Sequence, residues 1–197
     1  HLLGVNQMLL EDTAIKFKSQ YKNLIVPFNE NQLQPCSYDL TLDKDLLTFE
    51  FASNSCPPEA FITAYDKQVH SIDYQSIDLS ALKDEIYVLQ PNQFIIASTQ
   101  ETVNMPDDIA GRFEGKSSLG RLGLTTHVTA GFIDAGFSGQ ITLEMKNENR
   151  FPIWIKRGMK IGQICFFKMN GRARHPYGSE GLGSHYNNQN GPTPARS

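Results

Sequence analysis

The chain has 197 residues, 40% of them hydrophobic, which is typical of one globular domain with a sizeable core. Its formal net charge is −3, so no general field attracts nucleic acid or an anionic membrane, and we expect neither as a partner. The sequence contains no apolar run long enough to span a membrane and no signal peptide. Cys36, Cys56 and Cys165 are too dispersed for a disulfide framework, so we expect a cytoplasmic protein.

Taken in chain order, the pattern begins with residues 1–7, which we interpret as a vector-derived remnant before Met8. Residues 9–21 predict a helix, with Glu11 and Asp12 where the helix dipole favours acids. Short β segments follow, divided by Gly, Pro, Asn and Asp, and they predict a mainly β sandwich or barrel. The predicted strands cover residues 37–42, 47–51, 86–89, 94–98, 109–113, 139–147, 153–155 and 161–169.

The remaining segments are less regular. We interpret residues 52–80 as a long insertion or arm. Residues 8–174 then form a single domain. Residues 175–197 are rich in Gly, Asn and Pro and poor in aliphatic residues, so we expect a flexible tail that a ligand or a neighbouring subunit orders.

A short glycine-flanked turn carries two hydroxyls and two cations, in the order Gly115, Lys116, Ser117, Ser118, Leu119, Gly120 and Arg121. Backbone N–H groups, serine hydroxyls and cations suit phosphate oxygens. The turn lacks the spacing of a Walker loop. By itself it is as compatible with an ordinary Gly-Ser turn as with a phosphate site.

The segment 127–139 follows, in which three glycines predict a tight hairpin with Asp134 and Phe137 at its tip. A carboxylate beside an aromatic ring suits a sugar, because the acid accepts from a hydroxyl while the ring packs on the apolar face. The alternative is that Asp134 only closes a turn, which is the commoner role for an isolated aspartate.

The next strand alternates cleanly between apolar and polar residues. Ile141, Leu143 and Met145 share one face, and Thr142 and Glu144 share the other. If the apolar face packs into the core, Glu144 projects from a rigid strand into a site. The alternative is a surface glutamate paired with a nearby cation, Lys146 or Arg150.

Together these motifs closely resemble the dCTP deaminases of the dUTPase-like superfamily. The resemblance rests on Glu114–Gly123 (EGKSSLGRLG), His127–Glu144 (HVTAGFIDAGFSGQITLE) and Arg157–Gln163 (RGMKIGQ), the last with Arg157 where proline is usual. It extends to Gln34–Leu40 (QPCSYDL) and to the end of the tail, Gln189–Ser197. It covers nearly the whole chain from Met8 and is weakest over 52–80.

The resemblance implies a distorted, jelly-roll-type β-barrel with a short N-terminal helix, assembled as a homotrimer with active sites between subunits. It implies that Glu144 is the general acid and base for attack of water on C4 of cytosine. Asp134 would accept from the deoxyribose 3′-hydroxyl, and Phe137 would exclude a ribose. Ser117, Arg121, Asp134 and Glu144 are the expected catalytic residues. The expected substrate-binding residues are Lys116, Ser117, Ser118, Leu119, Gly120, Arg121, Asp134, Phe137, Thr142, Leu143, Glu144, Gln163, Tyr177, His185 and Gln189.

Two positions depart from the family pattern. His185 stands where the tail usually has a lysine, and a neutral imidazole attracts phosphate less than an ammonium does. Lys116 replaces the commoner arginine, which keeps the charge and loses the bidentate geometry.

The expected cofactor is Mg²⁺ travelling with the triphosphate, and no protein metal site is expected. The zinc-deaminase signature, H-x-E followed by P-C-x-x-C, is absent from the sequence, so we expect no zinc. The expected ligands are dCTP and dUTP, with dTTP as a possible feedback inhibitor.

The family divides into enzymes that release dUTP and enzymes that cleave it further to dUMP and diphosphate, supplying dUMP for thymidylate synthesis. Gly131 and Phe132 occupy the pair associated with the dUMP-forming members, where single-reaction enzymes commonly have His-Arg. We therefore favour the bifunctional enzyme. A monofunctional deaminase, a pure dUTPase and a non-catalytic nucleotide-binding regulator remain alternatives.

Overall fold

The computed structural model describes the whole chain except residues 1–7, 51–59, 66, 71–72, 130 and 197. The remnant predicted at residues 1–7 therefore lies outside the described residues. The α-helices in the described part are α1 (Asp12–Lys22) and α2 (Ser117–Gly120), and neither has the length and apolarity needed to cross a membrane. Short 3-10 turns occur at η1 (Glu30–Gln32), η2 (Leu79–Ala81) and η3 (Lys83–Glu85).

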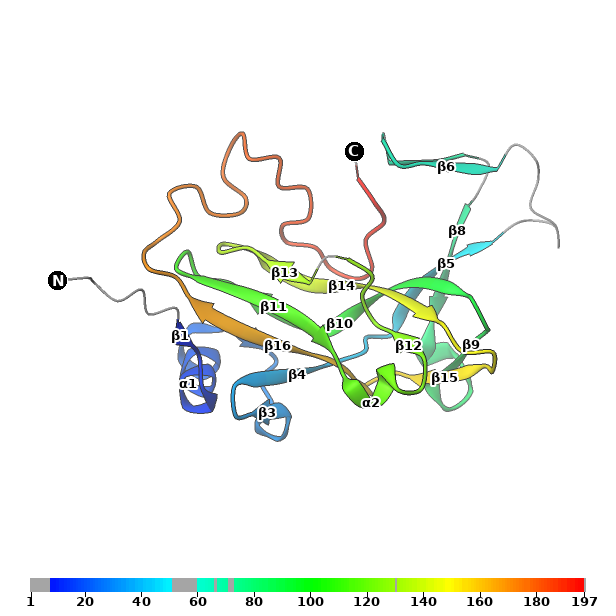
Figure 1. Cartoon of the computed structure of the whole chain (residues 1–197), viewed down its shortest axis with the longest axis horizontal. Helices are drawn as coiled ribbons and strands as arrows, with labels where there is room; N and C mark the ends of the chain where they lie inside the picture. Colours follow the sequence, from blue (N-terminus) through cyan, green and yellow to red (C-terminus); the bar gives the residue numbers. More distant parts are fainter. Residues whose placement is uncertain (1–7, 51–59, 66, 71–72, 130, 197) are drawn as a thin grey trace.

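Most of the described chain is in short strands (Figure 1). They are β1 (Met8–Leu9), β2 (Ile25–Val26), β3 (Leu33–Gln34), β4 (Ser37–Thr41), β5 (Asp45–Glu50), β6 (Phe61–Thr63), β7 (Gln68–His70), β8 (Asp73–Asp78), β9 (Ile86–Leu89), β10 (Phe94–Asn104), β11 (Ile109–Gly115), β12 (Leu124–Thr125), β13 (Phe132–Ile133), β14 (Ser138–Asn147), β15 (Ile153–Lys156) and β16 (Lys160–Lys168).

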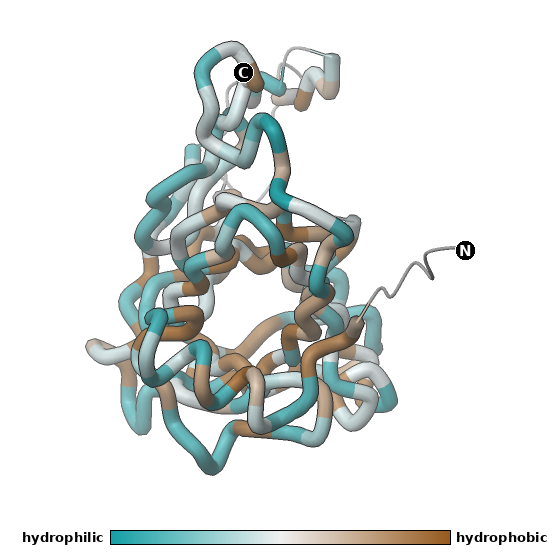
Figure 2. Tube along the Cα trace, turned by 90° about the vertical axis from the view of Figure 1, so that its left-hand side faces the viewer, coloured by the Kyte–Doolittle hydropathy of each residue, from teal (hydrophilic) through white to brown (hydrophobic). Residues whose placement is uncertain are grey.

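Most of the strands form two large antiparallel sheets around one core, and β9–β15 and β6–β7 form separate two-stranded pairs. One sheet has the order β13-β11-β16-β4-β3 with β1 beside β16, and the other has β12-β14-β10-β5-β8 with β2 beside β10. Side chains from both sheets, such as Phe166 and Leu143, are completely buried in one cluster. The trace encircles this shared interior in Figure 2. The sheets are open paths whose outer strands are short, so the hydrogen bonding does not close the expected barrel.

Helix α1 confirms the predicted N-terminal helix, displaced toward the C-terminus from 9–21. The Glu11 carboxylate accepts from the backbone N–H of Ala14 at 3.0 Å, which caps the first turn. Asn23 ends the helix in the left-handed conformation, with φ of 55°. Ile15 packs into the core.

The predicted strands all occur, with shifted ends. Strand β10 is much longer than the predicted 94–98, because it continues past an irregularity between Ser98 and Thr102 and pairs with β14 on both sides of it. The irregular arm predicted at 52–80 contains a β6–β7 hairpin and the strand β8, which pairs with β5. Strand β8 was missed because its polar sequence alternates poorly.

The hairpin predicted at 127–139 is wrong. Strand β13 pairs with β11, whereas β14 pairs with β10 in the other sheet, so the segment between them crosses from one sheet to the other. Two backbone hydrogen bonds with Met105 hold the crossing. The N–H of Gly136 donates to Met105 C=O, and the N–H of Met105 donates to Phe137 C=O. Phe137 is only 8% exposed and belongs to the core rather than to a hairpin tip.

The buried hydroxyl of Tyr38 on β4 generates a pH prediction. Burial is the main cause that raises its pKa from the ordinary 10.0 to about 12, with smaller contributions from Glu101 and Asp39, while the N–H of Asn29 donates to it and opposes the rise. The neutral hydroxyl is therefore favoured in the folded protein. Its contribution to stability is present below pH 10 and is lost as the pH rises toward 12.

We expect the free energy of unfolding of the natural chain to approach that of Tyr38→Phe as the pH rises from about 9 to about 11.5. Urea denaturation of both proteins across this range measures the difference. Parallel stability curves for the two proteins would contradict the assignment, because Tyr38→Phe lacks the titrating group.

Candidate active site

Glu144 is fixed on the outer side of β14 by the alternation of that strand. Leu143 and Met145 are completely buried, so Thr142 and Glu144 face away from the core. A Glu144 carboxylate oxygen accepts from the backbone N–H groups of Val128 and Thr129 at 3.1 and 3.3 Å. The carboxylate is therefore held by two donors from the connection between β12 and β13.

The alternative of a surface ion pair for Glu144 fails among the described residues. The ammonium of Lys146 binds Glu148 at 3.0 Å instead. Arg150, the other candidate, forms no ion pair with a described residue. Glu144 thus has backbone donors and no cationic partner in the described chain.

A cavity of about 340 Å³ lies beside Glu144 and is open to one side. It lies between β13, β14 and the C-terminal tail, and it is lined by six of the predicted site residues in addition to Glu144. Its lining residues are Phe132, Ile133, Asp134, Phe137, Ile141, Thr142, Glu144, Tyr177, Tyr186, Gln189, Thr193 and Ala195.

The tail forms its wall by pairing with the start of β14. The N–H of Asn188 donates to Ser138 C=O at 2.7 Å, and the N–H of Gln140 donates to Gln189 C=O at 3.1 Å. Gly139 has φ of +149°, and a Cβ there would lie 3.0 Å from the Gln189 carbonyl oxygen. A glycine at 139 is therefore needed for the tail to approach the strand.

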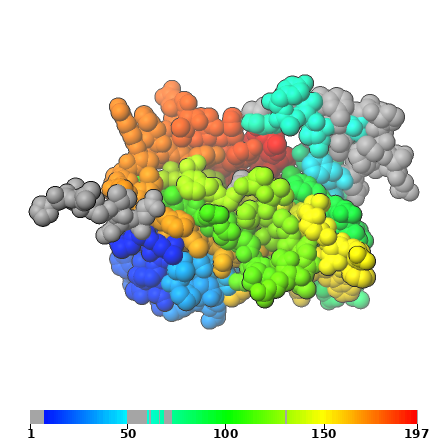
Figure 3. All heavy atoms as spheres, in the orientation of Figure 1, coloured from blue at the N-terminus to red at the C-terminus, as the bar shows by residue number. Residues whose placement is uncertain are grey.

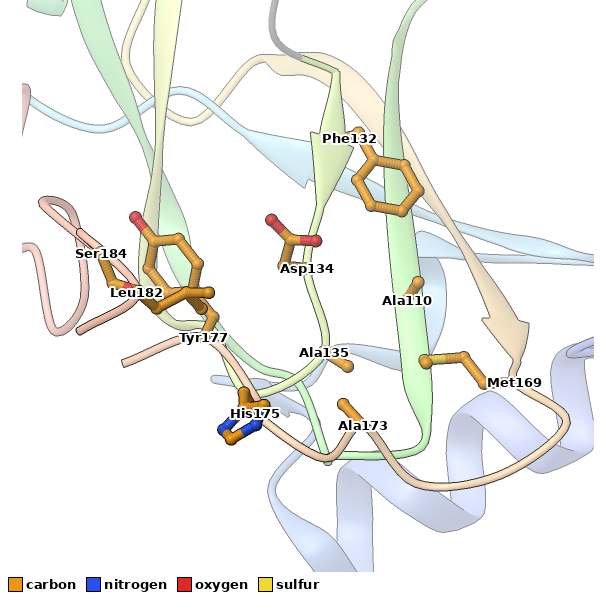
Figure 4. A pocket seen from close by; sticks show the side chains of 10 residues that line it. All are labelled: Ala110, Phe132, Asp134, Ala135, Met169, Ala173, His175, Tyr177, Leu182 and Ser184. Atoms are coloured by element: carbon orange, nitrogen blue, oxygen red, sulfur yellow. The ribbon is translucent and has the colours of Figure 1, made fainter. Parts of the chain in front are cut away.

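Asp134 and Tyr177 lie where the crossing segment meets the tail. The ring of Tyr177 packs edge-on against Phe137 with centroids 5.8 Å apart, and its hydroxyl accepts from the N–H of Tyr186 at 3.1 Å. Figure 4 shows the Asp134 carboxylate between the rings of Tyr177 and Phe132. These three residues also line a second hollow of about 440 Å³ that extends toward His175.

A third hollow continues from Glu144 toward the β6–β7 arm. It has a volume of about 390 Å³ and shares Thr142, Glu144 and the end of the tail with the first cavity. An aromatic group of Phe49, Tyr74 and Phe94 lines its far side. In Figure 3 the arm and the tail gather on the same upper face of the molecule.

The predicted phosphate loop lies elsewhere on the chain. Its residues Ser117–Gly120 form α2, with Lys116 before it and Arg121 after it. Figure 1 places α2 on the opposite edge of the molecule from the tail. None of the loop residues is among those that line the Glu144 cavity. Gln163 lies near this loop and does not line the cavity. On β16 it is opposite Glu114 of β11 and Asp39 of β4.

Three predicted substrate contacts have other roles in the structure. The Leu143 side chain is completely buried in the core, so only its backbone can meet a ligand. His185 is exposed, and its ring packs on Tyr186 with centroids 6.3 Å apart. The Gln189 amide nitrogen donates to Gln140 C=O at 2.7 Å, which leaves its buried oxygen without a partner. That oxygen is an acceptor and does not suit phosphate.

Sequence reasoning missed the backbone donors of Val128 and Thr129, because a donated N–H has no residue signature. It also missed Tyr186, Thr193 and Ala195 of the tail. Tyr186 stands between two residues singled out by the family pattern, His185 and Gln189, which is the one signal that the sequence offered.

No group of three or more His, Cys, Asp or Glu side chains in the described part of the chain is arranged to hold a metal ion.

Comparison with known proteins places the chain in two steps. The first concerns the fold: a crystal structure of 2′-deoxycytidine 5′-triphosphate deaminase from Agrobacterium tumefaciens superposes with a TM-score of 0.61 at 24% identity. The match covers 82% of this chain and 48% of that one, so this chain spans about half of that protein. This likeness shows a shared fold.

The second step gives the family. The family model described as dCTP deaminase-like matches residues 9–169. A protein of Streptomyces coelicolor named dCTP deaminase, dUMP-forming, is 47% identical over 96% of this chain and 95% of its own length. A protein of the same name from Nocardia farcinica is 46% identical over 96% of this chain and 92% of its own. The chain belongs to the dCTP deaminase family.

Gly131 lies just before β13 and generates a prediction about the segment that leads to Asp134. A Cβ at this position would lie 2.8 Å from the Phe113 carbonyl oxygen and 3.3 Å from His127 Cε1, while the N–H of Phe113 donates to Gly131 C=O at 2.7 Å. Because a backbone oxygen cannot move aside cheaply, Gly131→Ala must shift the segment that carries Asp134. We expect kcat/KM for dCTP to fall on the order of 10- to 100-fold.

Steady-state kinetics and a melting curve measure this effect. Gly171→Ala is the matched control, since a Cβ at Gly171 meets nothing within 4 Å. Equal kinetics of Gly131→Ala and the natural chain would refute the tight packing that we assign to this position.

Proposed function

We propose that this chain deaminates dCTP at C4 and then cleaves the product to dUMP and diphosphate in the same site. The observation that carries the proposal is the Glu144 carboxylate, held by two backbone N–H groups in a cavity that it shares with Asp134 and Tyr177. The family membership and the dUMP-forming relatives support the same activity.

In the first reaction, Glu144 takes a proton from a water molecule as its oxygen attacks C4 of the cytosine ring. The electron pair of the C4=N3 bond goes to N3, which receives this proton from Glu144. Glu144 then moves the remaining hydroxyl proton to the 4-amino nitrogen, the C4–N bond breaks as the C4=O bond forms, and ammonia leaves. The N–H groups of Val128 and Thr129 hold one carboxylate oxygen, which leaves the other for water. Thr142, on the same strand face, lines the cavity and would contact the base.

In the second reaction, a water oxygen attacks the α-phosphorus of dUTP and the bond to the bridging oxygen breaks, which releases diphosphate. Asp134 is exposed at the cavity wall, where it can both accept from the 3′-hydroxyl and orient this water. Phe132 is exposed beside it, and the glycine at 131 lets the segment pack closely. Phe137 supports Tyr177 and would restrict the sugar through that ring.

The triphosphate needs the cationic loop at α2, which lies apart from Glu144 on the same chain. We therefore infer a homotrimer in which Ser117, Ser118 and Arg121 of one subunit complete the site of the next. These three side chains are exposed and make no hydrogen bond or ion pair with another described residue. Gln163, near this loop, would act with it.

The tail from residue 175 onward would close over the nucleotide, bringing Tyr177 and Gln189 to it, with His185 as a weaker phosphate contact. Mg²⁺ would enter with the triphosphate, whose oxygens supply its ligands and whose charge it offsets. A bound dTTP shares the sugar and triphosphate of the substrate, so feedback inhibition at this site is part of the proposal. We propose a cytoplasmic location.

The product of dCTP turnover tests the proposal. We expect dCTP with Mg²⁺ to give dUMP, diphosphate and ammonia without free dUTP, because both reactions occur before release. Ion-exchange chromatography of the nucleotides measures this. Accumulated dUTP would indicate a monofunctional deaminase, and rapid dUTP hydrolysis without dCTP turnover a pure dUTPase. Nucleotide binding without turnover would indicate a regulator.

Glu144→Gln tests the role of the carboxylate. The amide keeps the shape and can still accept from Val128 and Thr129, but it cannot take a proton from water. We expect ammonia release to fall on the order of 100- to 10,000-fold while dCTP affinity changes little. Calorimetry and an ammonia assay measure the two quantities.

The control is Glu148→Gln, which changes an exposed glutamate just beyond the same strand. Ammonia release by Glu144→Gln at the rate of this control would remove Glu144 from the mechanism.

A further inference from the structure

A buried carboxylate that the reaction does not use lies beneath the α2 loop. Asp39 is in the centre of β4, and its side chain is 2% exposed. One carboxylate oxygen binds the Lys116 ammonium at 2.6 Å. The other binds the Lys160 ammonium at 3.0 Å and accepts from the Gln34 amide at 3.2 Å. Both oxygens are therefore satisfied by named donors.

The two lysines come from different parts of the fold. Lys116 immediately precedes α2, and Lys160 begins β16, the strand next to β4. Removing a carboxylate from water is costly unless cations and hydrogen bonds compensate. The ion pair between Asp39 and Lys116 joins the α2 loop to β4, a strand of the β13-β11-β16-β4-β3 sheet. The Asp39 site also carries two ammonium groups for one carboxylate, which leaves a positive surplus beside the loop.

Lys116 differs from its neighbours in the loop. Its side chain is 25% exposed and its ammonium is committed to Asp39, whereas Ser117, Ser118 and Arg121 are exposed. A lysine held in this way anchors the start of α2. The free hydroxyls and the guanidinium then face solvent from a fixed turn, as a polyphosphate site requires.

We propose that Asp39 is a positioning residue for the triphosphate: through Lys116 it fixes the loop so that Ser117, Ser118 and Arg121 meet the phosphates together. This rests on the proposed function. It assigns Lys116 mainly to anchoring the loop and not to direct phosphate contact.

The test compares Asp39→Asn, Lys116→Met, their double variant and Lys160→Met in the full chain. We expect Asp39→Asn to raise KM for dCTP on the order of 10- to 100-fold, because the loop loses its anchor. Lys116→Met should have a similar effect, and the double variant should be no worse than the more impaired single variant, because both changes break one contact. Asp39→Glu should restore part of the loss.

Lys160→Met is the matched control, since it removes the other ammonium from the same carboxylate without touching the loop. We expect it to lower the melting temperature and to leave KM within about twofold. A fall in KM for Asp39→Asn would mean that Asp39 competes with phosphate for Lys116, which overturns the proposal. Unchanged KM with a lower melting temperature would give Asp39 a structural role only, and additive effects would make Lys116 a separate ligand.

Binding of dCTP is measured for the same variants by calorimetry, so the proposal does not depend on turnover. If the natural chain binds dCTP and does not convert it, the proposed function fails while the dissociation constants still report on Asp39. Equal dCTP affinity of the natural chain and Asp39→Asn, or no binding by either, would overturn the inference.

Discussion

Strand β14 packs one face into the core and presents Glu144 from its other face to the cavity. Leu143 and Met145 are completely buried, and this fixes the register in which Glu144 points outward. A slip of one residue would bury the carboxylate and expose two core side chains, so packing of the core guarantees the orientation of Glu144. The same strand receives the tail through Gln140, whose N–H donates to the Gln189 carbonyl. Glu144 and the tail that lines the same cavity are thus aligned by contacts of one strand.

The cationic loop at α2 and the cavity carboxylates lie on different sides of the fold. A chain with a net charge of −3 attracts no polyanion as a whole, so a triphosphate must be held by a local group of cations and donors. That group is at α2, while the carboxylates Asp134 and Glu144 are on the other side of the fold. In the proposed homotrimer, the cavity would depend on a neighbouring copy for its cations, and activity would then require assembly.

The sequence predicted the parts of the structure that local pattern determines. The alternation around Glu144 identified its face correctly, and the acidic residues Glu11 and Asp12 marked the start of α1. It failed where pairing between distant segments decides. Residues 127–139 have the glycines of a hairpin, but hydrogen bonds to Met105 draw the segment across two sheets, and Phe137 enters the core. The backbone donors to Glu144 and the separation of α2 from the cavity are equally properties of the assembled fold, and no periodicity encodes them.

The lysine at 116, where the family more often has arginine, is explained by the partner beneath it. The Asp39 carboxylate divides its two oxygens between two ammonium groups, Lys116 and Lys160. An arginine at 116 would present two parallel N–H donors and would tend to take both oxygens, because the guanidinium matches a carboxylate bidentately. Lys160 would then lose the Asp39 oxygen to which it binds. A point charge at each oxygen satisfies both lysines, so the two positions depend on each other and the departure at Lys116 is compatible with an intact loop.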